Sequence, residues 1–536
     1  MRLEVESPET TLVVPEYPPA PPVAPPRRRR LDRFELSMLA LFGAISLWVL
    51  LLDLFQVVAH GRVWTGTDGV YLVDQMQYLA WIHDAASHGL ASNLFVVQST
   101  PADYFQPAIM ISGGIAALGV APWLALLLWK PVAVIAAFFA VRAYMYRALD
   151  GRWPRRAALV IGLFFGAMTF SAGAVTAFGD LFLGFLSWGY TFGLLAVAAM
   201  AGALLSYDRA RTANRLRWAP GVLGAIASLL HPWQGELLII LIIGGELMIE
   251  LRRRQALTRR RLMQAGATIL LTALPLFYYV VLTRVDLSWH LARGASKHSF
   301  PLLPVLLAIA PLAVAAIPAY RVRPRSFIGA ATRFWPLAAL VVFILSGTGF
   351  AATPLHAFQG ISIPLAVLAV EGVQLVRWRR LRRPRLVAVL AVLAVTVPSL
   401  VVELNSARTL AAPTVDNANF ITKDERDAIG YLTNDPRPGG VMTRSYLGAI
   451  IPGATGRHTY VGDCLWSEPQ CYWRVGTTQE LFDGTLGTAF SRKLVLGSGA
   501  RFVLADCKTQ ADLERILGPV VRSVRHFGCA AVYTVQ

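Results

Sequence analysis

Long apolar runs alternate with short arginine-rich segments along most of the chain. Most of these runs reach the roughly twenty residues that a helix needs to cross the hydrocarbon core of a bilayer. The pattern therefore predicts a polytopic α-helical membrane protein with about eleven transmembrane helices. The runs lie near residues 36–58, 122–146, 157–177, 187–206, 218–230, 235–251, 263–283, 301–320, 333–350, 361–377 and 385–403.

Two apolar segments do not fit a single crossing. Residues 218–251 exceed the length of one span, so we expect two helices joined by a turn at HPWQG, which begins at His231. The run at 106–119 is short, and a crossing there would move every later arginine cluster to the opposite side of the membrane. We therefore expect this run to lie along the outer interface.

With eleven spans, all the arginine clusters fall on one side, which is typical of cytoplasmic loops. The N-terminus is then cytoplasmic and the C-terminal segment extracytoplasmic, in a plasma (inner) membrane. We expect a disordered Pro-rich tail at 1–33, a transmembrane domain at 34–403 with its first outer loop at 59–121, and a soluble α/β domain at 404–536. The clusters lie at 27–30, 142–156, 209–217, 252–261, 321–333 and 377–385.

Composition and charge agree with a membrane protein. Of the 536 residues, 55% are hydrophobic and only 15% are charged, which is more apolar surface than a soluble protein can bury. The net charge of +18 does not indicate nucleic-acid binding, because the arginines lie in short loops between apolar runs.

All the cysteines lie in the C-terminal segment, outside the apolar runs. This confinement indicates an oxidising compartment and disulfide bonds, with reduced thiols as the alternative, and the spacing does not match a structural zinc site. The pairing stays open. The candidates are Cys464, Cys471, Cys507 and Cys529.

Five segments resemble motifs of the GT-C superfamily of polyprenyl-phosphate-sugar-dependent glycosyltransferases, and specifically of its bacterial members. They are VDQMQYLAWIHDAASHG, QPAIMISGGIAALG, HPWQG, PLHAFQGISIPLAVLAV and IPGATGRHTYVGD. Each motif is short, but the resemblance in architecture covers nearly the whole chain. It implies an inverting membrane enzyme that moves a hexose or pentose from a polyprenyl-phosphate donor to an envelope glycan, lipid or protein acceptor at the extracytoplasmic face.

The resemblance also implies roles for residues of the first outer loop. Asp74 matches the position of the base that deprotonates the acceptor hydroxyl, although it could instead cap the following helix. Asp68, in TGTDG, is either a second catalytic acid or a turn residue, and Tyr78 either lines the pocket or packs. Many members carry two adjacent acids here. Because Asp74 is followed by Gln75 in this chain, the use of a divalent cation stays open.

A cationic segment is expected to stabilise the departing phosphate. His290, Arg293 and Lys297 in SWHLARGASKHSF have the spacing of one helix face, and a guanidinium binds phosphate oxygens through two hydrogen bonds. Contact with lipid headgroups is the alternative.

Three further polar residues lie at outer turns between spans. His231, His356 and Gln359 are expected to contact the acceptor or the phosphate, with helix capping or headgroup contact as alternatives. Lys130, inside the second span, is costly there unless it extends its ammonium towards the membrane surface or pairs with another group, and we expect the former.

Two other functions compete with the transferase. A transporter or flippase of a lipid-linked or small polar substrate would carry ionisable residues near the membrane midplane and an internal repeat, and neither is evident in the sequence. A non-catalytic membrane scaffold is the third reading. Proximity of Asp74, His356 and Arg293 would favour the enzyme.

Overall fold

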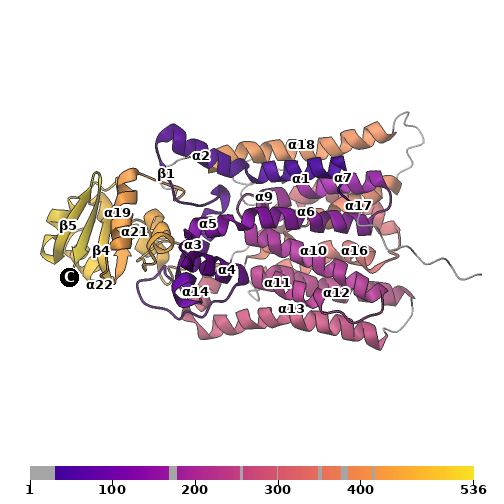
Figure 1. The fold of residues 1–536 in the computed structure, drawn as a ribbon, viewed down its shortest axis with the longest axis horizontal. Coiled ribbons are helices and arrows are strands. Elements are labelled where there is room, and N and C mark those ends of the chain that lie inside the picture. The colour runs from indigo at the N-terminus through magenta and orange to yellow at the C-terminus, as the bar shows by residue number, and fades with distance from the viewer. Residues whose placement is uncertain are drawn as a thin grey trace, which may run out of the picture.

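The computed structural model describes residues 30–167, 178–253, 258–297, 300–347, 353–375, 384–412 and 417–536. A long bundle of helices carries a smaller unit with a β-sheet at one end (Figure 1). The bundle helices are α1 (Arg33–Ser46), α2 (Trp48–His60), α5 (Pro122–Leu127), α6 (Trp129–Ala148), α7 (Arg152–Phe164), α9 (Leu183–Leu186), α10 (Thr191–Thr212), α11 (Ala219–Leu230), α12 (Pro232–Arg253), α13 (Arg259–Val285), α15 (Leu302–Ala316), α16 (Phe327–Gly347), α17 (Ser362–Leu375) and α18 (Pro384–Leu410).

Within the described residues, seven helices are long and apolar enough to cross a membrane, or eight if the bent pair α1 and α2 is one span. Helices α11 and α17 are apolar but shorter. The protein is therefore a multi-pass membrane protein, whereas a total of eleven spans stays a prediction. Helices α11 and α12 meet at His231, which ends α11, so the long segment at 218–251 does form two helices.

The outer helices of the bundle show large apolar side chains to their surroundings. On α13, Leu270, Leu274 and Phe277 are each more than half exposed. Such a surface would be costly in water and is favourable against lipid chains, while the helical backbone satisfies its own hydrogen bonds.

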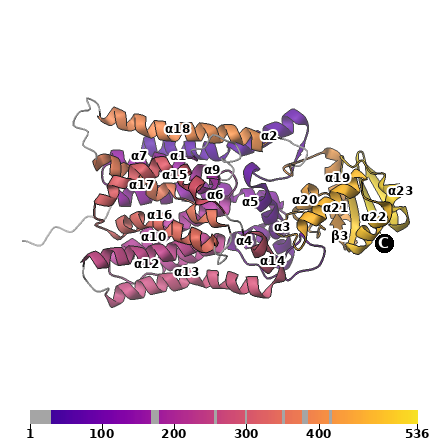
Figure 2. The ribbon, with the colours of Figure 1, turned by 180° about the vertical axis from the view of Figure 1, so that it is seen from behind.

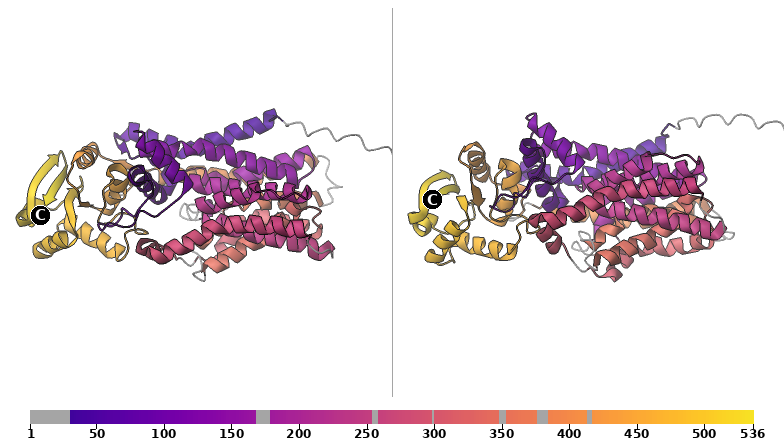
Figure 3. Two further views of the ribbon diagram at one scale, coloured as in Figure 1. Left: turned by 60° about the horizontal axis from the view of Figure 1, so that its bottom comes forward. Right: turned by 90° about the horizontal axis from the view of Figure 1, so that it is seen from below.

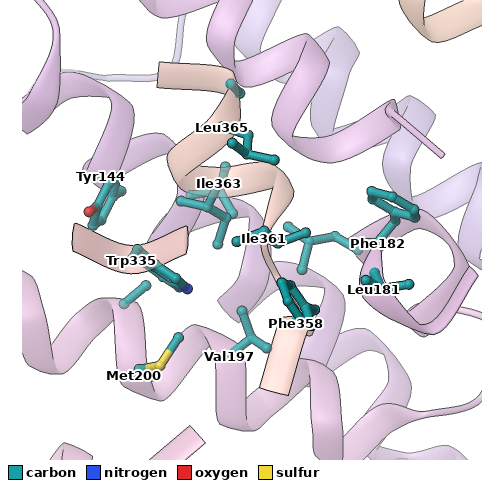
Figure 4. Packing of buried hydrophobic residues seen from close by; sticks show 14 of the residues in the cluster. Tyr144, Leu181, Phe182, Val197, Met200, Trp335, Phe358, Ile361, Ile363 and Leu365 are labelled. Atoms are coloured by element: carbon teal, nitrogen blue, oxygen red, sulfur yellow. The ribbon is translucent and has the colours of Figure 1, made fainter. Parts of the chain in front are cut away.

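The interior of the bundle is packed with aromatic and branched side chains. Trp335 and Tyr144 meet edge to face near Ile361 and Ile363 (Figure 4). In the same core, the N–H of Gly360 donates to the carbonyl of Leu181 at 3.0 Å. This bond joins the short 3-10 helix η2 (Gly179–Leu181) to the residues that follow a second one, η4 (Pro354–Phe358), and the two helices lie far apart in the sequence.

Three helices of the first and a later loop cover the end of the bundle. They are α3 (Leu72–His88), α4 (Pro107–Ala117) and α14 (Leu287–Ala295), and they lie between the bundle and the β-sheet unit (Figure 2). Helix α4 has 11 residues, which is too few for a crossing.

The C-terminal unit holds a four-stranded sheet in the order β3-β4-β6-β5, from β3 (Gly440–Met442), β4 (Ala500–Ala505), β5 (Val521–Phe527) and β6 (Ala530–Val535). Strands β3 and β4 are parallel and the other pairs antiparallel. Charged side chains on the edge strand β5 discourage pairing with another chain. Helices α19 (Lys423–Asn434), α20 (Ser445–Thr455), α21 (Cys471–Asp483), α22 (Thr488–Gly497) and α23 (Leu513–Leu517) pack around it (Figure 3).

Two disulfides lie within this unit, and a strand pair ties it to the first loop. Cys464 pairs with Cys471, and Cys507 pairs with Cys529. Strand β2 (Phe420–Ile421) pairs antiparallel with β1 (Val63–Trp64) of the first loop. The domain that follows the last bundle helix is thereby tied back to the loop that follows α2.

Candidate active site

Asp74 lies in the first turn of α3, and the cap position of that helix is Tyr71, whose side chain makes no capping bond. The N-cap alternative for Asp74 is therefore wrong, and its carboxylate is partly buried. Gln75 holds the start of the helix. Its Nε2 donates to the carbonyls of Asp68 at 3.1 Å and Gly189 at 3.0 Å, and its Oε1 accepts from the N–H of Asp68 at 2.6 Å.

A second acid, Asp180 of η2, is the centre of a polar network. Its Oδ2 lies 3.2 Å from Nε2 of His356, and its Oδ1 accepts from Gln359 Nε2 and from the hydroxyl of Tyr71, each at 2.9 Å. Two segments distant from η2 in the sequence therefore converge on this carboxylate, and the packing of η2 against η4 brings one of them to it.

Asp74 and the Asp180 network interact electrostatically. Burial raises the pKa of Asp74 to about 6, while His356 lowers it and the negative charge of Asp180 raises it. Burial also opposes ionisation of Asp180, but His356 and the hydrogen bonds from Gln359 and Tyr71 hold its pKa below the ordinary value. Asp74 is thus a carboxylate with a raised proton affinity, and Asp180 is its ionised neighbour.

His231 lies beside the Asp180 network, in contact with the rings of His356 and Trp233. Its ring centroid is 4.8 Å from that of His356 and 4.7 Å from that of Trp233. Neither ring nitrogen has a hydrogen-bond partner in the described part of the chain, although only 3% of the residue is exposed. Burial lowers the pKa of His231 well below its usual value, as does the nearby His356, so it is a neutral imidazole able to donate and accept.

Tyr78 is buried one turn beyond Asp74 and packs against Phe192, with ring centroids 4.8 Å apart. Its pKa is raised by burial and by the charge of Asp74, and its hydroxyl is hydrogen-bonded with Tyr190. Tyr190 in turn stacks on Tyr71. Tyr78 therefore both packs and forms part of the wall around Asp74.

Asp68 lies apart from this network, in a buried ion pair with Lys130. The Lys130 ammonium also donates to the carbonyl of Ser187 at 2.8 Å, and only 3% of the residue is exposed. The expectation that Lys130 extends to the membrane surface is wrong, because Asp68 and the carbonyl compensate its charge inside the protein.

The cationic segment adopts only part of its expected form. His290 and Arg293 lie on α14, but the helix ends at Ala295, so Lys297 is not on their helix face. The reason is the terminal turn, in which the N–H of Lys297 bonds to the carbonyl of Gly294 at 3.3 Å. His290 and Lys297 are exposed and Arg293 is partly buried.

The C-terminal part of this segment nevertheless contacts the site. The carbonyl of Ser296 accepts from the N–H of Thr353 at 3.3 Å, three residues before His356. The ring of Phe300 contacts that of Phe178, two residues before Asp180. The segment therefore lies beside the Asp180 network.

The side chains of this site that could bind a divalent cation would do so through oxygen atoms. Asp74 and Asp180 offer carboxylates, and Oε1 of Gln359 lacks a partner among the described atoms. Within the described residues, only Asp424, Cys507 and Cys529 form a group of three His, Cys, Asp or Glu side chains close enough together to bind one metal ion. The two cysteines form a disulfide, however, so they cannot supply thiolates. The acids of the site thus match a cation in donor type, but do not form a preassembled three-ligand set.

Sequence reasoning did not select Asp180 or Asp463 for the site. Asp180 follows a glycine in FGDLF, between two apolar runs, and that position at a turn between predicted spans is the signal that could have found it. Asp463, in the C-terminal unit, interacts electrostatically with Asp74. Nothing in its local sequence separates it from an ordinary turn residue.

No protein-family model matches the chain, and no curated protein matches it in sequence. Solved structures do match. The apo oligosaccharyltransferase of Archaeoglobus fulgidus aligns with a TM-score of 0.54 at 13% identity, over 90% of this chain and 71% of that one. The arabinofuranosyltransferase AftD from Mycobacteria aligns with a TM-score of 0.53 at 15% identity, over 95% of this chain and 42% of that one. Both are glycosyltransferases of the GT-C superfamily, and the chain described here has the GT-C fold.

Proposed function

We propose that the protein is an integral-membrane glycosyltransferase of an envelope pathway. It moves a hexose or pentose from a polyprenyl-phosphate donor to a glycan, lipid or protein acceptor at the extracytoplasmic face of the plasma membrane. The observation that carries this proposal is Asp74, a carboxylate with a raised pKa beside Asp180 and His356, at the end of a GT-C bundle. The two structural relatives are transferases by name, which supports the class of reaction.

In this mechanism Asp74 is the base. Its carboxylate takes the proton of the acceptor hydroxyl as that oxygen forms a bond to the anomeric carbon of the sugar. The bond between this carbon and the phosphate oxygen breaks, and its electron pair leaves with the lipid phosphate. Attack from the face opposite the phosphate inverts the anomeric centre. A pKa of about 6 leaves Asp74 mostly ionised at neutral pH, with more affinity for the proton than an exposed aspartate has.

The other residues bind and orient the reactants. Arg293, Lys297 and His290 stand beside the site as cations and donors for the departing phosphate. His231 and His356 offer ring nitrogens to sugar or phosphate oxygens, with Gln359 holding Asp180 in position. A divalent cation, if used, would bind at Asp74 and Asp180 and would neutralise phosphate charge.

The ion pair of Asp68 with Lys130 favours a supporting role for Asp68, which braces the start of α3 through Gln75. Electrostatic contact between Asp74 and His356 favours an enzyme over a scaffold, because a scaffold has no use for a costly cluster of buried acids.

The experiment that tests this function uses the native host. The gene is deleted and restored as wild type, as Asp74→Asn, or as Asp150→Asn, whose side chain is fully exposed at the far end of the bundle. Envelope glycans and lipid-linked sugars are then compared by mass spectrometry at equal protein levels.

We expect one hexose- or pentose-sized mass to disappear on deletion, with accumulation of the donor lipid. Wild type and Asp150→Asn should restore the mass, and Asp74→Asn should not. An unchanged glycan profile after deletion would contradict the transferase. Full restoration by Asp74→Asn would remove Asp74 as the base.

A further inference from the structure

Asp463 of the C-terminal unit has a buried carboxylate oxygen without a partner. Its Oδ1 accepts from the N–H of Leu465 at 2.8 Å, and its carbonyl accepts from the N–H groups of Trp466 at 3.0 Å and Ser467 at 2.7 Å. Its Oδ2 has no hydrogen bond within the described residues, although only 6% of the residue is exposed. An unsatisfied buried carboxylate oxygen is costly, which indicates that a ligand supplies the missing donor.

The turn that carries Asp463 lies on the Asp74 face of α3. Asp74, Tyr78 and Trp81 follow one another at the spacing of a single helix face. The ring of Trp466 contacts that of Trp81, with centroids 5.3 Å apart. Asp463 therefore lies over the face that presents the proposed base.

The turn is held there from several sides. Asn93 of the first loop donates to the carbonyl of Trp466 at 2.9 Å, and Ser467 donates to the carbonyl of Phe95 at 3.0 Å. Helix α20 approaches α3 closely at Gly453, where an added Cβ would come within 2.8 Å of Cβ of Leu79. The position of Asp463 relative to α3 is thus set by direct contacts between the C-terminal unit and the first loop.

Electrostatics agree with this placement. Burial and the negative charge of Asp74 raise the pKa of Asp463 to about 7. The hydrogen bond from the N–H of Leu465 acts in the opposite direction and lowers it. On Asp74 itself the acting groups are His356 and Asp180 of the bundle. Asp74 therefore stands between bundle groups on one side and an acid of the C-terminal unit on the other.

We propose that Asp463 binds the acceptor, through a hydrogen bond from an acceptor hydroxyl or amide N–H to its free oxygen. This inference rests on the proposed transferase function and deepens it. The phosphate of the donor binds on the bundle side, near His356, and the acceptor enters from the side of the C-terminal unit. Asp463 is a positioning residue: it orients the acceptor so that the nucleophilic hydroxyl faces Asp74, and it gains no proton in the transfer.

The test is Asp463→Asn, because asparagine can keep the bond from the Leu465 N–H while its amide replaces the free oxygen. In the deletion host at equal protein levels, we expect the glycan product to fall at least about tenfold, the effect of one lost hydrogen bond to a charged group. The matched control is Asp427→Asn, an exposed acid of the same unit, which should stay within about twofold of wild type.

A second measurement separates the acceptor from the donor. Purified wild type and Asp463→Asn are compared for retention of undecaprenyl phosphate, used as a probe of the donor-phosphate site, and we expect equal retention. Loss of both product and lipid-phosphate retention would place Asp463 in the donor site and overturn the proposal.

Other outcomes also decide the question. If Asp463→Asn restores the product like wild type, the proposal fails while the transferase stands. If wild type itself restores no glycan, both fail. Asp463→Glu keeps a carboxylate and should regain part of the lost product. Equal loss in both variants together with earlier thermal unfolding would mark a structural role and contradict acceptor binding.

Discussion

Two acids of one loop, Asp68 and Asp74, have opposite surroundings. Asp68 is paired with Lys130 and bonded through its backbone to Gln75, so its charge is compensated inside the protein. Asp74 directly precedes Gln75 and has a raised pKa; the charges of His356 and Asp180 act on it, and its own charge acts on Asp463. Burial raises the pKa of both carboxyl groups, so the difference between them is the partner. Asp68 is held in an ion pair with Lys130, whereas Asp74 has no such ion pair within the described residues and remains available for chemistry.

The largest expected effect is the loss of transfer activity when Asp74 is replaced, which distinguishes it from Asp68. Asp74→Asn should lower the transfer rate by about 10²–10⁴-fold, the usual contribution of a general base, with unfolding temperature not reduced. The rate of product formation in membranes that contain each variant measures this. A loss of less than about tenfold would assign the base to another residue.

Asp68→Asn should act on stability instead. Breaking a buried ion pair leaves the Lys130 charge uncompensated and should cost about 3–5 kcal/mol of unfolding free energy. Thermal unfolding in detergent measures this, and Asp68→Asn combined with Lys130→Met should recover most of the loss. An Asp68→Asn protein that is as stable as wild type but inactive would reverse the roles of the two acids.

The raised pKa of Asp74 has a cost in stability that depends on pH. The folded value of about 6 exceeds the ordinary 3.8, so the folded state binds the proton more tightly than the unfolded chain does. Unfolding free energy therefore falls as pH rises from about 4 to 6. Removing the charge with Asp74→Asn should stabilise the protein by about 1–3 kcal/mol at pH 7 and by only about 0.5 kcal/mol near pH 4. Unfolding temperatures measured at both pH values test the sign. A gain that is larger at the acidic pH would contradict it.

The smallest effect concerns the exposed cation beside the site. Lys297→Gln should weaken retention of undecaprenyl phosphate by about two- to fivefold, and less so in high salt, because exposed charges are screened. The control is Lys493→Gln, an exposed lysine of α22 in the C-terminal unit. Equal retention by wild type and Lys297→Gln in low salt would remove Lys297 from the phosphate site.

The sequence alone determined the class of the protein. Hydropathy is a local property, so apolar runs predict helices that cross a membrane, and the confinement of all the cysteines predicts a separate C-terminal unit. A match to a short motif selected Asp74, and turns between spans selected His231 and His356. Asp180 stood at such a turn as well, but one acid in a short loop is a weak signal until its partners are known.

Only the tertiary structure decided which of these residues meet. His356 and Gln359 reach Asp180 because two 3-10 helices from distant parts of the chain pack together in the bundle core. Lys130 turns inward because Asp68 of another segment lies within reach, and Asp463 joins Asp74 because the C-terminal unit docks on α3. Local patterns specify helices and their apolar faces. Contacts between segments hundreds of residues apart depend on how all those faces pack at once, and no local pattern contains that information.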